Sequence, residues 1–101
     1  MNVFGRAFEP TGATQSVAND GTDNTITLTG IGDVNSSVHL VVVGTETVFV
    51  RLDGVAATTA AGIPLVGNGN TQVFSMPVGS TTVRAIGTAG STLYVTPGRG
   101  V

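Results

Sequence analysis

Hydrophobic and polar residues alternate along much of the chain in short runs, a pattern typical of half-buried β-strands. In Thr25–Thr29, Ile26 and Leu28 face one side and the threonines face the other. Such runs predict strands at 14–18, 25–29, 38–43, 47–52, 63–66, 71–76, 81–86 and 91–96. Clusters of Gly, Asn, Asp and Pro between them are typical of turns. About seven or eight short strands at this spacing predict one all-β domain, an antiparallel β-sandwich of jelly-roll-like or barrel form.

The strongest local pattern predicts a hairpin of Val38–Val43 and Thr47–Leu52 around Gly44–Glu46. In this hairpin Val42 would lie opposite Val48, Leu40 opposite Val50 and Val38 opposite Leu52, with all six on one buried face. On the other face His39 would lie next to Arg51.

Three other segments are expected to have less regular structure. The Gly- and Ala-rich stretch 53–62 predicts a loop rather than a helix. Pro64 predicts that 63–66 is an edge strand, because proline has no N–H to give to a sheet. Residues 97–101 are expected to form a short tail at the end of the domain, which spans 14–101.

Residues 1–13 differ from the rest of the chain because they do not alternate, and we interpret them as an N-terminal arm. Phe4 and Phe8 stand before the break at Pro10 and Gly12, so we expect them to be apolar anchors that contact a partner. The alternative is that both phenylalanines plug one end of the core.

Composition excludes several classes of protein. Val, Thr, Gly and Ala make up more than half of the chain, while Glu occurs twice and Lys not at all, which excludes a helical bundle. Only 10% of the residues are charged, and the four scattered arginines form no basic stripe, so nucleic-acid binding is not expected. The longest purely apolar run, Leu40–Val43, is too short for a membrane span. No cysteine is present for disulfides or thiolate metal sites.

The chain shows no catalytic or cofactor-binding motif. His39 is the only histidine, and we expect it on an outer strand face or in a subunit contact rather than as a general base. Asp20, Asp23 and Asp33 lie in adjacent loops where carboxylates could hold Ca²⁺, but they lack a calcium-loop spacing and are also ordinary turn residues. We therefore expect a non-enzymatic protein without metal or cofactor, and Tyr94 half-buried with its hydroxyl at a rim.

The scarcity of charge favours assembly. Sheet edges and surfaces of free β-proteins are usually protected by charged residues, lysine above all. An uncharged surface loses little solvation when it is covered, so we expect a homo-oligomer, most simply a dimer or trimer. The alternative is a small neutral monomer.

The second half of the chain resembles small structural proteins encoded near the capsid genes of tailed bacteriophages. The resemblance is carried by the segments Arg51–Gly54, Ala61–Gly67, Gln72–Pro77, Thr82–Gly87 and Gly90–Gly98. It implies a capsid decoration (cement) protein on the virion surface, a β-sandwich or jelly roll that clamps neighbouring major capsid protein subunits. The resemblance brings no catalytic residues.

Two other functions remain open from the sequence. A tail- or neck-associated phage protein would have the same fold, and no residue distinguishes it from a head protein. A carbohydrate-binding β-sandwich is the other alternative, although sugar recognition normally uses exposed aromatic faces and the chain has no Trp and one Tyr.

Overall fold

The computed structural model describes residues 8–29, 31, 36–67 and 71–99. Nine strands form in this part of the chain, and the α-helix is absent from it. The strands are β1 (Glu9–Pro10), β2 (Gln15–Ala18), β3 (Asn24–Thr27), β4 (Ser36–Val43), β5 (Val48–Arg51), β6 (Ile63–Leu65), β7 (Thr71–Ser75), β8 (Thr82–Gly87) and β9 (Thr92–Arg99). The all-β prediction is confirmed.

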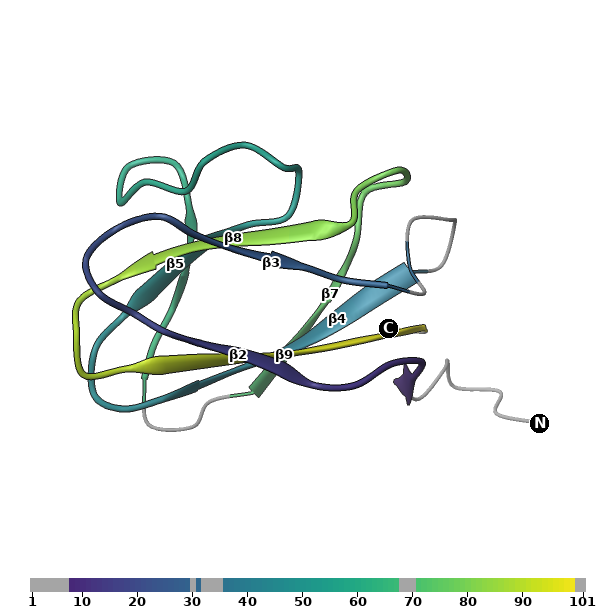
Figure 1. Cartoon of the computed structure of the whole chain (residues 1–101), viewed down its shortest axis with the longest axis horizontal. Helices are drawn as coiled ribbons and strands as arrows, with labels where there is room; N and C mark the ends of the chain where they lie inside the picture. Colours follow the sequence, from purple (N-terminus) through teal and green to yellow (C-terminus); the bar gives the residue numbers. More distant parts are fainter. Residues whose placement is uncertain (1–7, 30, 32–35, 68–70, 100–101) are drawn as a thin grey trace.

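The strands form two antiparallel sheets that pack face to face (Figure 1). Sheet A has the order β1-β9-β4-β7, with β2 pairing to the same β9 that β1 pairs with; sheet B has the order β3-β8-β5-β6. The pairs are nested: β5 with β6, β4 with β7, β3 with β8 and β2 with β9. A long hairpin folded over on itself gives this nesting, so the sandwich has jelly-roll connectivity.

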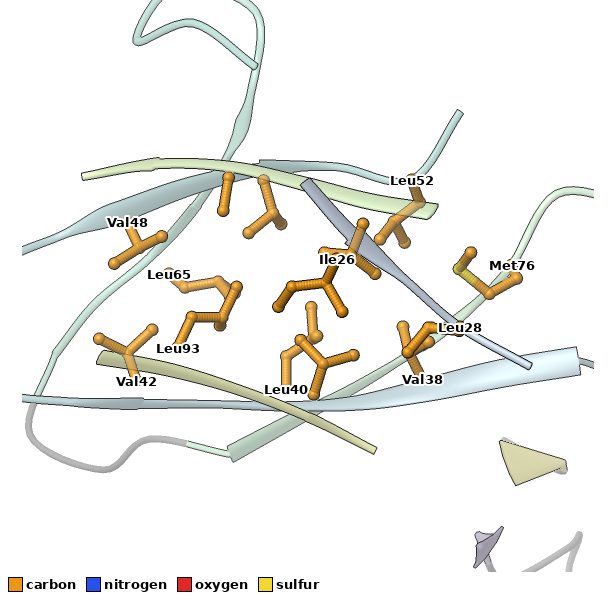
Figure 2. Close-up of a cluster of buried hydrophobic side chains, with 14 residues drawn as sticks. Ile26, Leu28, Val38, Leu40, Val42, Val48, Leu52, Leu65, Met76 and Leu93 are labelled. Carbon is orange, nitrogen blue, oxygen red and sulfur yellow. The ribbon is translucent and has the colours of Figure 1, made fainter. Parts of the chain in front are cut away.

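The core lies between the sheets and consists of a cluster of 14 buried apolar side chains (Figure 2). Val38, Leu40 and Val42 of sheet A are fully buried, as are Val48 and Val50 of sheet B. Leu93 and Val95 of β9 and Val83 of β8 complete the fully buried aliphatic set. Each full burial of such a side chain contributes roughly 1.5–3 kcal/mol, so alternation in β4, β5, β8 and β9 stabilises the sandwich.

The predicted hairpin of 38–43 with 47–52 is wrong. β4 pairs with β7 and β9, whereas β5 pairs with β6 and β8 in the other sheet. The turn after β4 takes the chain from sheet A to sheet B. Gly44 in this turn has a φ of 127°, a backbone conformation that glycine adopts readily and other residues rarely adopt. All six residues are buried, as the alternation predicted. Two strands bury the same residues whether they pair side by side in one sheet or face each other across the core, so burial alone did not distinguish the two arrangements.

The predicted C-terminal tail is also wrong in part. β9 continues through Pro97 and Gly98 to Arg99, pairing along its whole length with β4. Pro97 is buried and Gly98 is closely covered by the Phe8 ring, so neither position ends the strand. The 53–62 segment is a loop, as predicted, with a single turn in which the Gly62 N–H donates to the Thr58 carbonyl at 2.9 Å.

Candidate functional site

The outer face of sheet A carries no Asp, Glu or Arg side chain on its strands. This face is defined by the outward residues of β2, β4, β7 and β9, which the register places together: Ser16, Ala18, Ser37, His39, Val41, Val43, Thr71, Val73, Ser75, Thr92, Tyr94, Thr96 and Gly98. Glu9 and Arg99 lie opposite each other only at the end of the sheet. The face is therefore a surface of valines, threonines, small residues, one tyrosine and one histidine, without acidic or arginine side chains.

Several of its apolar side chains are exposed. Val43 is 51% exposed and Tyr94 40% exposed, while Val41 and Val73 are half-buried between their neighbours. Threonine and serine hydroxyls supply most of the polarity, and the hydroxyls of Thr14 and Thr96 form a hydrogen bond of 2.7 Å. Covering this face with another protein removes no ion from water, so the desolvation cost is low.

Phe8 lies at one end of this face and not in the core. Its ring centroid is 5.6 Å from that of His39, and the same ring closely covers Gly98, where a side chain would collide with it. The neighbouring Glu9–Pro10 pairs with β9, and the Thr11 N–H donates to the Pro97 carbonyl at 2.9 Å. Phe8 is thus held half-buried on the outer face of sheet A; Phe4, the other expected anchor, lies outside the described residues.

His39 does not neighbour Arg51, so that prediction is wrong. In the register His39 lies between Thr96 and Val73, both on the outer face of sheet A. Arg51 belongs to sheet B, opposite Arg84. The error follows from the wrong hairpin, because it merged the outward residues of two different sheets into one face.

The outer face of sheet B is built differently, because it holds both ion pairs of the described residues. Arg51 donates from Nε to Asp53 Oδ1 at 3.1 Å and from Nη2 to Asp53 Oδ2 at 2.6 Å. The hydrogen bonds from Arg51 hold the pKa of Asp53 at about 2, with a smaller contribution from the Val55 N–H. This pair is partly exposed, so it stabilises the fold only weakly.

The second ion pair ties a loop over sheet B. Burial acts to raise the pKa of Asp23, but hydrogen bonds from Arg84 and from the Ala57 N–H outweigh it and lower the pKa. Ala57 is buried, its N–H lies 3.0 Å from Asp23 Oδ1, and Arg84 also donates to the Gly54 carbonyl. The loop of residues 53–62 therefore lies across the outer side of sheet B, in the teal part of Figure 1.

The carboxylates of Asp20 and Asp23, weighed in the sequence as alternative cation ligands, accept hydrogen bonds from the protein itself. Asp20 accepts hydrogen bonds from the Thr22 hydroxyl at 2.7 Å and from Asn24 and the Thr22 N–H, which lower its pKa. Asp23 is engaged by Arg84, and Asp33 lies outside the described residues. Within the described ranges, His, Asp and Glu nowhere form a group of three that could hold a metal ion.

A cleft of about 340 Å³ opens between β6 and β7, at the side where the two sheets present their edges. Its walls are mainly apolar, from Ile63, Phe74 and Pro77, and the Arg51–Asp53 pair lies among its lining residues. The arrangement suits apolar contact, and the carboxylate of Asp53 in its wall is engaged by Arg51.

Sequence reasoning missed most of the outer face of sheet A. It identified Phe8 and expected Tyr94 half-buried, and the structure leaves Tyr94 exposed. Val73 and Thr71 could not be added because the pairing of β7 with β4 is not visible in local alternation. The available signal was the absence of charge at outward positions in every one of these strands.

Comparison with known proteins finds no matching family model, no matching curated protein and no matching solved structure. In the described part of the chain there is also no helix of the length and apolarity needed to cross a membrane.

Proposed function

We propose that this chain is a structural protein that binds a larger protein surface through the outer face of sheet A, as a decoration protein of a phage capsid. The observation that carries the proposal is the uneven distribution of charge. The outward residues of sheet A lack Asp, Glu and Arg, whereas sheet B concentrates the ion pairs of the described residues on its outer face. An uncharged sheet face with exposed Val43 and Tyr94 is suited to burial against protein.

Jelly rolls occur in viral capsid proteins and also in lectins and cupins, so the fold alone does not choose among these functions. The surface favours protein contact. Among the described residues Tyr94 is the one exposed aromatic side chain, and a single ring is a poor platform for stacking a sugar. The major capsid protein is the partner in this proposal, and the protein acts without catalysis, metal or cofactor.

Phe8 extends the same surface. Its ring packs against His39 and Gly98 at the end of the face, so a bound partner would cover the ring and the sheet together. Phe4 would belong to the same contact. The footprint of the face is about 400 Å², from the lengths of β2, β4, β7 and β9, a rise of about 3.3 Å per residue and a spacing of about 4.8 Å between strands.

The direct test is to locate the protein on purified virus particles. Virions from a lysate of the strain that encodes the chain are banded on a density gradient and labelled with gold-conjugated antibody against the purified protein. We expect label distributed over the heads of intact particles, and the chain in their peptide mass spectrum. Label confined to tails or necks would favour the tail- or neck-associated alternative, and absence from the particle band would refute a virion role.

A further inference from the structure

The β7 edge differs from the other sheet edges of the described sandwich. It consists of Thr71–Ser75, with no charged residue and no proline. At the edge of sheet B, β6 contains Pro64, which disfavours pairing with a further strand because proline has no N–H to donate. On the opposite side of the sandwich, Gln15 of β2 donates from Nε2 to the Thr27 carbonyl of β3 at 2.9 Å and joins the two edges. β7 is thus an unprotected edge, of the kind that pairs with another chain.

The register shows which backbone groups of β7 are open. The Met76 N–H donates to the Ser36 carbonyl at 2.8 Å, immediately beyond the pairing of Ser37 with Ser75. In an antiparallel ladder the hydrogen-bonded pairs alternate, so Phe74 and Gln72 bond to β4. The N–H and C=O groups of Thr71, Val73 and Ser75 therefore point away from sheet A.

We propose that β7 pairs with β7 of a second copy of this chain, antiparallel and around a two-fold axis at Val73. In this register Val73 opposes Val73 of the partner subunit, and Thr71 opposes Ser75 of the partner subunit. The open backbone groups of the two strands then make about six hydrogen bonds. In a symmetric interface the same strand meets a copy of itself, so an uncharged strand pairs without the repulsion between like charges that a charged strand would suffer.

The side chains suit this pairing. Phe74 points inward and lines the 340 Å³ cleft between β6 and β7, together with Ile63 and Pro77. Gln72 of the partner subunit would lie opposite Phe74 and close the mouth of the cleft. Arg51 and Asp53, which also line the cleft, are already paired with each other and need no charged partner.

The pairing also gives a docking surface of sufficient size. One outer face of sheet A covers about 400 Å², below the roughly 800 Å² per partner of a standard protein interface. Two copies joined through β7 form one continuous sheet with a continuous uncharged face of about 800 Å², which reaches that size. The proposed dimer is inferred from the β7 edge alone and goes beyond the proposed function. The dimer and the binding function can therefore be refuted independently of each other.

Cysteine cross-linking tests the axis directly, because the natural chain contains no cysteine. Across a hydrogen-bonded antiparallel pair the two Cα atoms lie about 5.5 Å apart, within disulfide range. Under mild oxidation we expect Val73→Cys to form a disulfide-linked dimer at least about tenfold faster than Val43→Cys, an exposed position remote from the axis. Equal rates, or faster linking of Val43→Cys, would overturn the proposal.

A pair of double variants tests the register. Thr71→Lys with Ser75→Lys places like charges opposite each other at both ends of the paired strands, whereas Thr71→Glu with Ser75→Lys places opposite charges there. Both sites are exposed, and circular dichroism checks that each variant keeps the β-fold. In sedimentation equilibrium at micromolar concentrations we expect the wild type and the Glu/Lys variant to dimerise, and the Lys/Lys variant to remain at 10.1 kDa. A wild type that stays monomeric, or two double variants with equal dimerisation, would contradict β7 pairing.

Discussion

The two outer faces of the sandwich differ in how much of their surface the chain itself covers. Sheet B covers its outer side with its own loop, residues 53–62, and fixes that loop through Asp23 and Arg84. Sheet A leaves valines, threonines and Tyr94 on an uncharged surface, with only Phe8 and the chain after it seated at one end. The difference shows that one face is completed within the chain, while the other suits completion by another protein.

The largest expected effect is at Phe49, which is compared with Phe8, a second half-buried phenylalanine on the opposite face of the sandwich. Phe49 pairs with Ile86 and Pro64 and lies beneath Gly62 of the covering loop, so Phe49→Ala should cost about 2–3 kcal/mol of unfolding free energy. The Phe8 ring contacts His39 and Gly98 with one of its faces only, so Phe8→Ala should lower the unfolding free energy by about 1 kcal/mol. Urea denaturation followed by circular dichroism measures both.

The same pair decides the role of Phe8. If it were a plug of the core, Phe8→Ala would destabilise the fold at least as much as Phe49→Ala. A Phe8→Ala variant that folds normally but binds less well to the partner surface is the result expected of an anchor.

A smaller effect separates the two acidic residues of sheet B. Asp23→Ala removes the ligand of Arg84 and of the Ala57 N–H in a partly buried setting, and should destabilise by about 2 kcal/mol. Asp53→Ala removes a more exposed partner of Arg51 and should change the melting temperature much less. Equal melting temperatures for the two variants would mean that Asp23 does not hold the loop.

The pH dependence of stability should come from sheet B and its adjoining loops. The pKa values of Asp20, Asp23 and Asp53 are lower in the folded protein than in the unfolded chain, that of Asp53 reaching about 2. Their stabilisation is therefore present above about pH 4 and is lost as the pH falls toward about 2. We expect the melting temperature to fall over this range, and to fall less in Asp23→Ala; a wild-type melting temperature that stays constant would contradict these pKa shifts.

Much of the fold was predictable because alternation is a local property. Ile26, Leu40 and Val50 were correctly placed in the core by parity, and Pro64 correctly marked an edge strand. Parity does not say which strand is the neighbour, since β4 and β5 bury the same residues as a hairpin or as opposite walls of a sandwich. The extension of β9 through Pro97 and Gly98 also depends on distant partners, β4 and β1.

The candidate site was less predictable for the same reason. The low charge of the whole chain indicated a contact surface, but its location depends on the order of strands in sheet A. Asp23 looked like a turn residue or a cation ligand, and its partner Arg84 lies 61 positions away. Contacts at that separation leave no mark on local spacing.

The central claim is that the outer face of sheet A is the binding surface, and two valines of equal exposure test it. Val43 lies on that face and Val55 in the loop over sheet B, and both are 51% exposed. Val43→Glu and Val55→Glu should each change stability by less than about 0.5 kcal/mol. Each purified variant is titrated onto particles that lack the wild-type protein. The account predicts at least about tenfold weaker binding for Val43→Glu, which buries a charge, and unchanged binding for Val55→Glu. Equal binding of both variants, or a loss confined to Val55→Glu, would contradict it.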